Sequence, residues 1–116
     1  MLNRNQGQVA AAEAERLGAE ARLEAIDLAA RAELAAAEAR DAQAQRAVQV
    51  YGGGLRDLAR RNLDVVRQTF ELGRATVFEV LAEQRRWLEI EQGYTAAARE
   101  AWEARVAVTR ARGETK

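Results

Sequence analysis

Apolar positions along the chain recur at the three-to-four-residue spacing of α-helices. Residues 8–50 are almost entirely Ala, Glu, Arg, Leu and Gln, which are among the strongest helix formers. Beyond them, large apolar residues continue at helical intervals almost to the end of the chain. The pattern predicts an all-α protein with one helix over about residues 6–72 and a second over about residues 76–113.

A run of glycines interrupts the first predicted helix. Each Gly inside a helix costs about 1 kcal/mol relative to Ala, so Gly52, Gly53 and Gly54 in succession predict a break, kink or hinge at residues 51–55. A phosphate-binding loop is the alternative, but no Gly-Lys-Ser/Thr follows the glycines and no strand precedes them. A helix hinge is therefore the preferred interpretation.

A second glycine marks a tight turn at residues 73–75. Gly73 suits the left-handed backbone conformation that commonly ends a helix. Thr76, followed three residues later by Glu79, forms a capping box, in which each side chain hydrogen-bonds the backbone amide of the other residue. One helix therefore ends at this turn and another begins directly after it. The two helices are expected to fold into a long antiparallel hairpin, a single domain of residues 1–116.

The two arms of the expected hairpin differ in length. Folding about the turn pairs residue i with roughly residue 149 − i, so the end of the second helix near Gly113 lies opposite residue 36. At 1.5 Å per residue, the residues before 36 form an overhang of about 50 Å. They have no partner within the chain, which indicates a component of an elongated assembly.

The composition also favours partners. Of the 116 residues, 27 are Ala, whereas Leu, Ile, Val and Phe together number only 24. A chain with so few large apolar residues builds a thin core and is close to the range where a fold needs other chains to stay stable. Trp87 and Trp102 are expected to be packing anchors.

Charge and residue usage exclude several classes of function. The 18 basic and 18 acidic residues give no net charge, which removes the electrostatic basis of general nucleic-acid binding. The chain contains no His and no Cys, so the usual zinc and haem sites, Ser–His triads and thiol nucleophiles are excluded. We expect no enzyme activity and no cofactor.

Three segments together resemble the TolC-like outer-membrane efflux channel family. Residues 2–12 (LNRNQGQVAAA) are similar to the passage from a barrel strand into a long helix, in the form typical of the heavy-metal-cation branch. Residues 70–85 (FELGRATVFEVLAEQR) resemble the periplasmic tip, where an aromatic-x-x-Gly turn leads into the next helix. Residues 94–113 look like the closing helix of the family. The resemblance covers the whole chain and corresponds to the second of two repeats.

This resemblance implies a fold, a location and partners. Members are homotrimers whose strands form a barrel in the outer membrane and whose long helices form a tube in the periplasm. The chain would supply one periplasmic hairpin of that tube, without the β-barrel strands. Transport through the tube is passive, and a periplasmic adaptor protein docks at the helix tips and couples the channel to an inner-membrane pump.

The resemblance also implies site residues. The adaptor-docking tip would comprise Leu72, Gly73, Arg74, Ala75 and Thr76. In related channels an acid after the tip glycine helps to form a ring of carboxylates at the periplasmic aperture, and Glu79 occupies that place. A second acid often follows at the position of Ala82, and here Glu83 is the nearest substitute. Capping of the helix is the simpler role of Glu79, and the two roles are compatible.

A soluble structural coiled-coil hairpin, such as a stalk or a periplasmic adaptor hairpin that mediates protein–protein interaction, is the alternative function. Hairpins of that class show a narrow heptad stripe over several heptads. The apolar positions here are more dispersed, and the first half of the chain is rich in Ala. The sequence therefore favours the channel segment.

Overall fold

The computed structural model describes residues 2–114, and these residues are all-α, with no strand among them. The elements in chain order are α1 (Leu2–Val50), a wide π-type turn η1 (Tyr51–Leu55), α2 (Arg56–Glu71) and α3 (Val77–Ala111). The second predicted helix therefore ends two residues earlier than the sequence suggested.

The chain divides into two units, residues 1–36 and residues 37–116. The first unit is helical throughout its described part, and almost all of its described side chains are exposed. Its exposed large apolar residues are Val9, Leu17, Leu23, Ile26 and Leu28. The second unit contains the end of α1 together with η1, α2 and α3. The boundary falls where the count from the turn predicted that intrachain partners would end.

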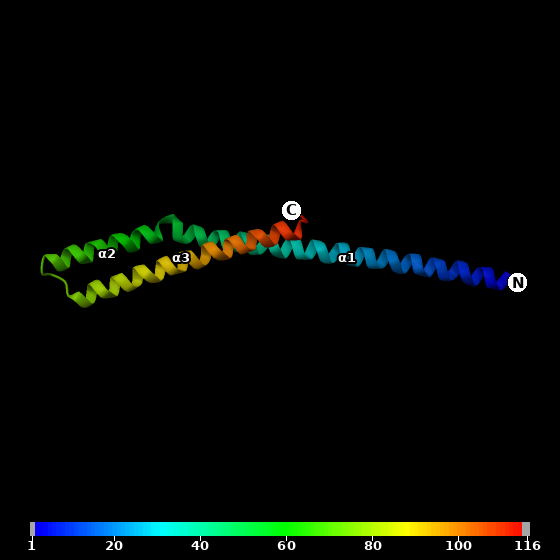
Figure 1. Cartoon of the computed structure of the whole chain (residues 1–116), viewed down its shortest axis with the longest axis horizontal. Coiled ribbons are helices and arrows are strands. Elements are labelled where there is room, and N and C mark those ends of the chain that lie inside the picture. The colour runs from blue at the N-terminus through cyan, green and yellow to red at the C-terminus, as the bar shows by residue number, and fades with distance from the viewer. Residues whose placement is uncertain (1, 115–116) are drawn as a thin grey trace. The chain divides into compact units, whose positions relative to one another are not determined.

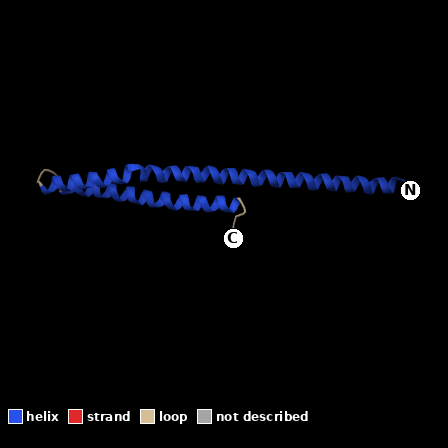
Figure 2. Cartoon of the chain, turned by 90° about the horizontal axis from the view of Figure 1, so that it is seen from above, coloured by secondary structure: helices blue, strands red, loops and turns tan. Residues whose placement is uncertain are grey.

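Within residues 37–116, α2 and α3 run side by side in opposite directions and are joined by the turn (Figures 1 and 2). The buried positions of this hairpin are Ala44, Ala59, Leu63, Ala97, Ala101, Ala104 and Val108. Five of these seven residues are Ala, so the helices can approach closely but bury little apolar area per position. The structure thus confirms a helical hairpin with a thin core.

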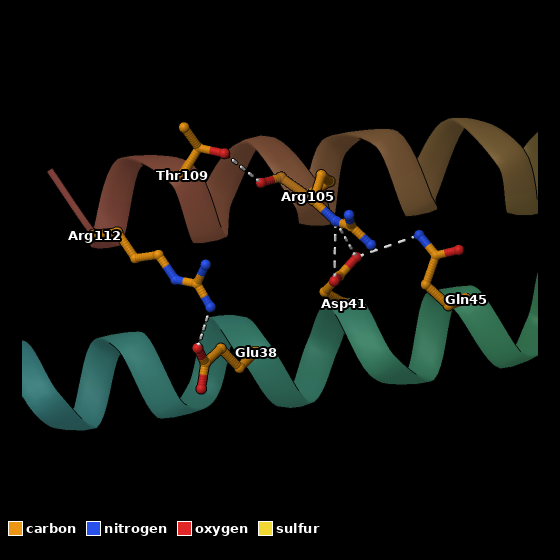
Figure 3. Close-up of polar contacts among 6 residues, drawn as sticks. All are labelled: Glu38, Asp41, Gln45, Arg105, Thr109 and Arg112. Atoms are coloured by element: carbon orange, nitrogen blue, oxygen red, sulfur yellow. Dashed lines mark hydrogen bonds and ion pairs between the residues drawn. The ribbon is translucent and has the colours of Figure 1, made fainter. Parts of the chain in front are cut away.

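Two ion pairs join the end of α1 to α3 (Figure 3). Arg112 donates to Glu38 at 2.7 Å, and Arg105 donates to Asp41 at 3.1 Å. The paired residue numbers add up to 150 and 146, close to the value of roughly 149 expected from the sequence. Exposed ion pairs contribute little to the free energy of folding. These two pairs therefore mainly show how the helices are aligned along their length.

The kink at η1 depends on one of its three glycines. Gly54 has φ 126° and ψ −12°, a conformation that residues with a Cβ rarely adopt, whereas no other residue of η1 departs from helical angles. The backbone N–H of Arg56 donates to the carbonyl of Tyr51, five residues earlier, which gives the turn its extra width. A Cβ added to Gly52 or Gly53 would meet nothing within 4 Å. Position 54 is therefore the one of these three at which the kink needs a glycine.

One packing expectation is wrong for this chain. Trp102 is 69% exposed, so it does not anchor α3 to the rest of the hairpin. Its neighbours Ala101 and Ala104 face the interface instead, at 6% and 3% exposure. Trp87, by contrast, is half-buried. Since a helix turns by about 100° per residue, a residue directly beside a core position points well away from the core.

Candidate interaction surface at the hairpin turn

The turn between α2 and α3 is closed by backbone hydrogen bonds. Gly73 has φ 70°, and its N–H donates to the carbonyl of Phe70 at 2.8 Å. The N–H of Arg74 donates to the carbonyl of Thr69 at 2.9 Å. This pair of bonds is the Schellman arrangement, which satisfies carbonyls that the end of a helix would otherwise leave free. The turn is therefore a well-defined structure that ends α2 at a fixed place.

The first turn of α3 is closed by the expected capping box. The Thr76 hydroxyl oxygen accepts from the Glu79 backbone N–H at 3.3 Å, and the Glu79 carboxylate accepts from the Thr76 backbone N–H at 2.6 Å. The Thr76 hydroxyl also donates to the same carboxylate at 2.9 Å. The two bonds that the carboxylate accepts, first the one from the backbone N–H and then the one from the hydroxyl, lower the pKa of Glu79 below its usual 4.5. The Glu79 carboxylate is thus bonded to the start of its own helix.

Large apolar side chains around the turn are exposed to solvent. Leu72 is 73% exposed and Phe78 is 78% exposed, while Val77 between them in sequence is about half exposed. Arg74 is also exposed, and it is the cationic residue of the turn. We call these four residues, Leu72, Arg74, Val77 and Phe78, the turn patch. An apolar group at the end of a hairpin, with one positive charge beside it, is the kind of surface that proteins use to contact one another.

Sequence reasoning placed Leu72, Gly73, Arg74, Ala75 and Thr76 at the tip but did not single out Phe78. The structure places all five at the turn, with Ala75 partly buried and the other four exposed. Phe78 follows Val77 directly, and two adjacent residues cannot both face the partner helix. That adjacency was a signal that one of the two would be exposed.

The two candidate aperture acids have different surroundings. Glu79 is exposed and bonded to Thr76. The side chain of Glu83 is only 19% exposed and accepts from Arg86 at 2.7 Å. Its second oxygen, Oε2, is buried and accepts no hydrogen bond from the residues that the structure describes. The structure therefore gives the two carboxylates separate partners instead of joining them in one cluster.

The outer sides of the hairpin carry further exposed apolar residues at heptad spacing. On α2 these are Leu58 and Val65, in line with Leu72 of the turn patch, and on α3 they are Leu81, Leu88 and, two heptads further on, Trp102. Residues seven apart lie on nearly the same side of a helix, so each set forms a stripe along its helix. Together with the exposed residues of the first unit, the stripes leave apolar surface available to other helices.

Two kinds of feature are absent from the described part of the chain. Residues 2–114 contain no group of three or more acidic side chains placed to hold a metal ion. Those residues also include no helix that is long and apolar enough to cross a membrane. The features that remain are the turn patch and the two stripes.

Comparison with known proteins adds no relative to this picture. No family model, no curated protein and no solved structure matches the chain.

Proposed function

We propose that the chain is a periplasmic helical segment of a trimeric outer-membrane efflux channel. It forms part of the wall of the export conduit, and its hairpin turn docks a periplasmic adaptor protein that connects the channel to an inner-membrane pump. The outer-membrane strands of such a channel belong to other parts of the protein. The sequence resemblance suggests this role, and the surface of the hairpin supports it.

The turn patch is the observation that carries the docking role. Leu72 and Phe78 are the two most exposed large apolar side chains of residues 37–116. They flank a turn whose backbone hydrogen bonds are satisfied, so the patch is presented on a preorganised support. Preorganised apolar anchors lower the entropic cost of binding, which is the property expected of a docking site.

The amount of exposed surface supports assembly with other helices. The chain has an accessible surface of 9632 Å². A compact monomer of 12.8 kDa is expected to expose about 6,300 Å², so this chain exposes about half as much again. Obligate oligomer interfaces bury about 2,000–5,000 Å² counted over both partners, so the excess on one chain is large enough for its share of such an interface. The heptad stripes on α2 and α3 would lie within such interfaces, but a coiled-coil assembly would use them in the same way, so they do not separate the channel from the alternative.

Site-specific photo-cross-linking in cells that make the full-length protein tests the proposal. A photoreactive phenylalanine analogue replaces Phe78 in the turn patch. The matched control places the same analogue at Arg110, an exposed position in the last turn of α3 at the other end of the hairpin. We expect the Phe78 position to trap a periplasmic adaptor protein, identified by mass spectrometry, and the Arg110 position to trap none.

The same experiment separates the channel from the alternative. A stalk would trap no adaptor and give no trimer through position 79, whereas an adaptor hairpin would trap an outer-membrane channel protein in place of an adaptor. Because the chain has no Cys, a single cysteine introduced at Glu79 can report trimers through a reagent with three maleimide arms, which joins one thiol from each of three protomers. The absence of both the adaptor product and the trimer would refute the channel role.

A further inference from the structure

The kink at η1 is held from both sides by one turn of α3. Tyr51, the first residue of η1, and Arg56, the first residue of α2, both contact residues between Glu91 and Tyr94. The kink itself contains Gly54 in a positive-φ conformation, which glycine permits and which residues with a Cβ rarely adopt. The contacts with α3 therefore lie on both sides of the residue that forms the kink.

On the α1 side of the kink, the Tyr51 ring packs against the backbone of α3 at Gly93. A Cβ added to Gly93 would lie 2.5 Å from the Tyr51 hydroxyl oxygen and 2.8 Å from the ring carbon that carries it. Real Cβ atoms do not approach other atoms so closely, so any larger residue at position 93 would displace the ring. Gly93 thus forms a notch that the side chain of Tyr51 fills.

On the α2 side of the kink, Arg56 makes three interactions with the same turn of α3. Its Nε donates to Glu91 Oε1 at 2.9 Å, and its Nη2 donates to Glu91 Oε2 at 2.7 Å. The guanidinium also lies 4.2 Å from the centre of the Tyr94 ring. Bidentate pairing fixes both the distance and the orientation of two groups, and the aromatic face restricts the guanidinium further.

These contacts differ from the other ion pairs of the hairpin. The side chains of Arg56 and Glu91 are 38% and 29% exposed, whereas each of the other two pairs between helices has an arginine that is more exposed, Arg105 at 62% and Arg112 at 48%. Arg56 is also the residue at which the helix resumes after Gly54. The pair is therefore the ion pair between helices that lies closest in sequence to Gly54.

We propose that Arg56, Glu91 and Tyr94, with Tyr51 in the Gly93 notch, form a latch that holds a hinge at Gly54 closed. With the latch intact, α2 stays packed on α3 at a single angle to the end of α1. When the latch is broken, the first turn of α2 leaves α3 and the angle at Gly54 varies, while the turn end of the hairpin stays paired. A partner that bound the Arg56 guanidinium through its own carboxylate would open the hinge. The latch does not depend on the function proposed above.

Distances between spin labels in the full 116-residue chain test the latch. The chain has no native Cys, so labels can be placed on introduced cysteines alone. One pair, at Arg46 and Arg67, spans the hinge, and both positions are exposed. A reference pair, at the exposed residues Gln68 and Arg85, spans the turn end of the hairpin.

The variant Glu91→Gln removes the charge of the latch. We expect the population of alternative distances across the hinge to rise about tenfold, the effect of losing a charge-assisted hydrogen bond. The reference distance should stay unchanged. The control Glu103→Gln removes the 3.7 Å pair with Arg99 on the same helix and should alter neither distance. A hinge distance that stays single and narrow in Glu91→Gln would overturn the proposal.

A second variant covers the case in which Glu91→Gln loses its helical structure. Gly93→Ala keeps every charge and improves the helix propensity of α3, but its Cβ displaces Tyr51. We expect it to broaden the hinge distance while circular dichroism shows no loss of helix. If Gly93→Ala retains the narrow wild-type distance, Tyr51 has no role in holding the hinge and the latch as proposed is wrong.

Discussion

At the scale of single residues, the features that the sequence predicted are those that depend on near neighbours. Gly73 takes the left-handed conformation expected at a helix end, and Thr76 with Glu79 forms the expected capping box. Each of these requires only residues within a few positions of one another, so the printed sequence contains all the information needed. The side-chain partner of Glu91 lies 35 residues away, and no local rule identifies it.

The cap also predicts how stability depends on pH. The Thr76 backbone N–H, followed by the Thr76 hydroxyl, keeps the pKa of Glu79 below its usual 4.5 in the folded chain. A carboxyl group whose pKa is lowered by folding contributes stability above its unfolded pKa and loses that contribution as pH falls through its folded pKa. We therefore expect Glu79→Gln to be less stable than wild type at pH 7, with the difference shrinking steadily below pH 4.5.

Urea unfolding followed by circular dichroism at pH 7 and at pH 3 measures this difference. The pKa of Glu91 is also lowered, chiefly by its hydrogen bond from Arg56, but that group is present in both proteins and its effect cancels. The stability difference should be small because the cap is exposed. A difference that stays constant from pH 7 to pH 3 would show that the Glu79 carboxylate does not stabilise the helix start through its charge.

At the scale of the elements, the sequence predicted the helices better than their contacts. Composition and period are enough to place a helix, and the turn fixes the pairing of the arms to within a few residues. An uncertainty of a few residues in this pairing is nevertheless as large as a full helical turn. It therefore leaves open whether a given side chain faces the partner helix or the solvent. For that reason the inward position of Glu83, the exposure of Trp102 and the Tyr51 notch at Gly93 had to come from the structure.

The small size of the buried residues predicts a penalty for larger ones. Ala104 is 3% exposed and belongs to a cluster with Ala44 and Ala101. We expect Ala104→Leu to destabilise the hairpin by about 1–3 kcal/mol, because extra methylene groups must push the helices apart. The control Ala82→Leu adds the same side chain at an exposed position of the same helix and should change stability by less than about 0.5 kcal/mol.

Urea unfolding of both leucine variants at the same protein concentration decides this point. The free energy of unfolding should fall for Ala104→Leu alone. Equal stability of the two variants would mean that the helices have room to accommodate leucine, and that close approach at alanine is not what holds them.

At the scale of the whole molecule, the two units have different means of stabilisation. The side-chain hydrogen bonds and ion pairs that join different helices of the described chain all involve residues from Glu38 to Arg112. Every buried residue of the described chain also lies in residues 37–116. The residues before Ala37 have the hydrogen bonds of their own helix and pairs at i,i+4 spacing such as Arg16 with Glu20, which contribute little each. Stability of the hairpin should therefore reside in the second unit.

A chain of residues 37–116 tests this division. We expect its unfolding midpoint to lie within a few degrees of that of the full chain, since a shift of about 4–8 °C corresponds to only 1 kcal/mol in a domain of this size.

If copies of the full chain cover the exposed residues of the first unit, the midpoint of the full chain alone will rise with protein concentration, because association stabilises the folded form by mass action. A shortened chain that unfolds far below the full one even at low concentration would mean that residues 1–36 stabilise the hairpin directly. In that event the exposed apolar residues of the first unit could no longer be explained as surface reserved for neighbouring helices.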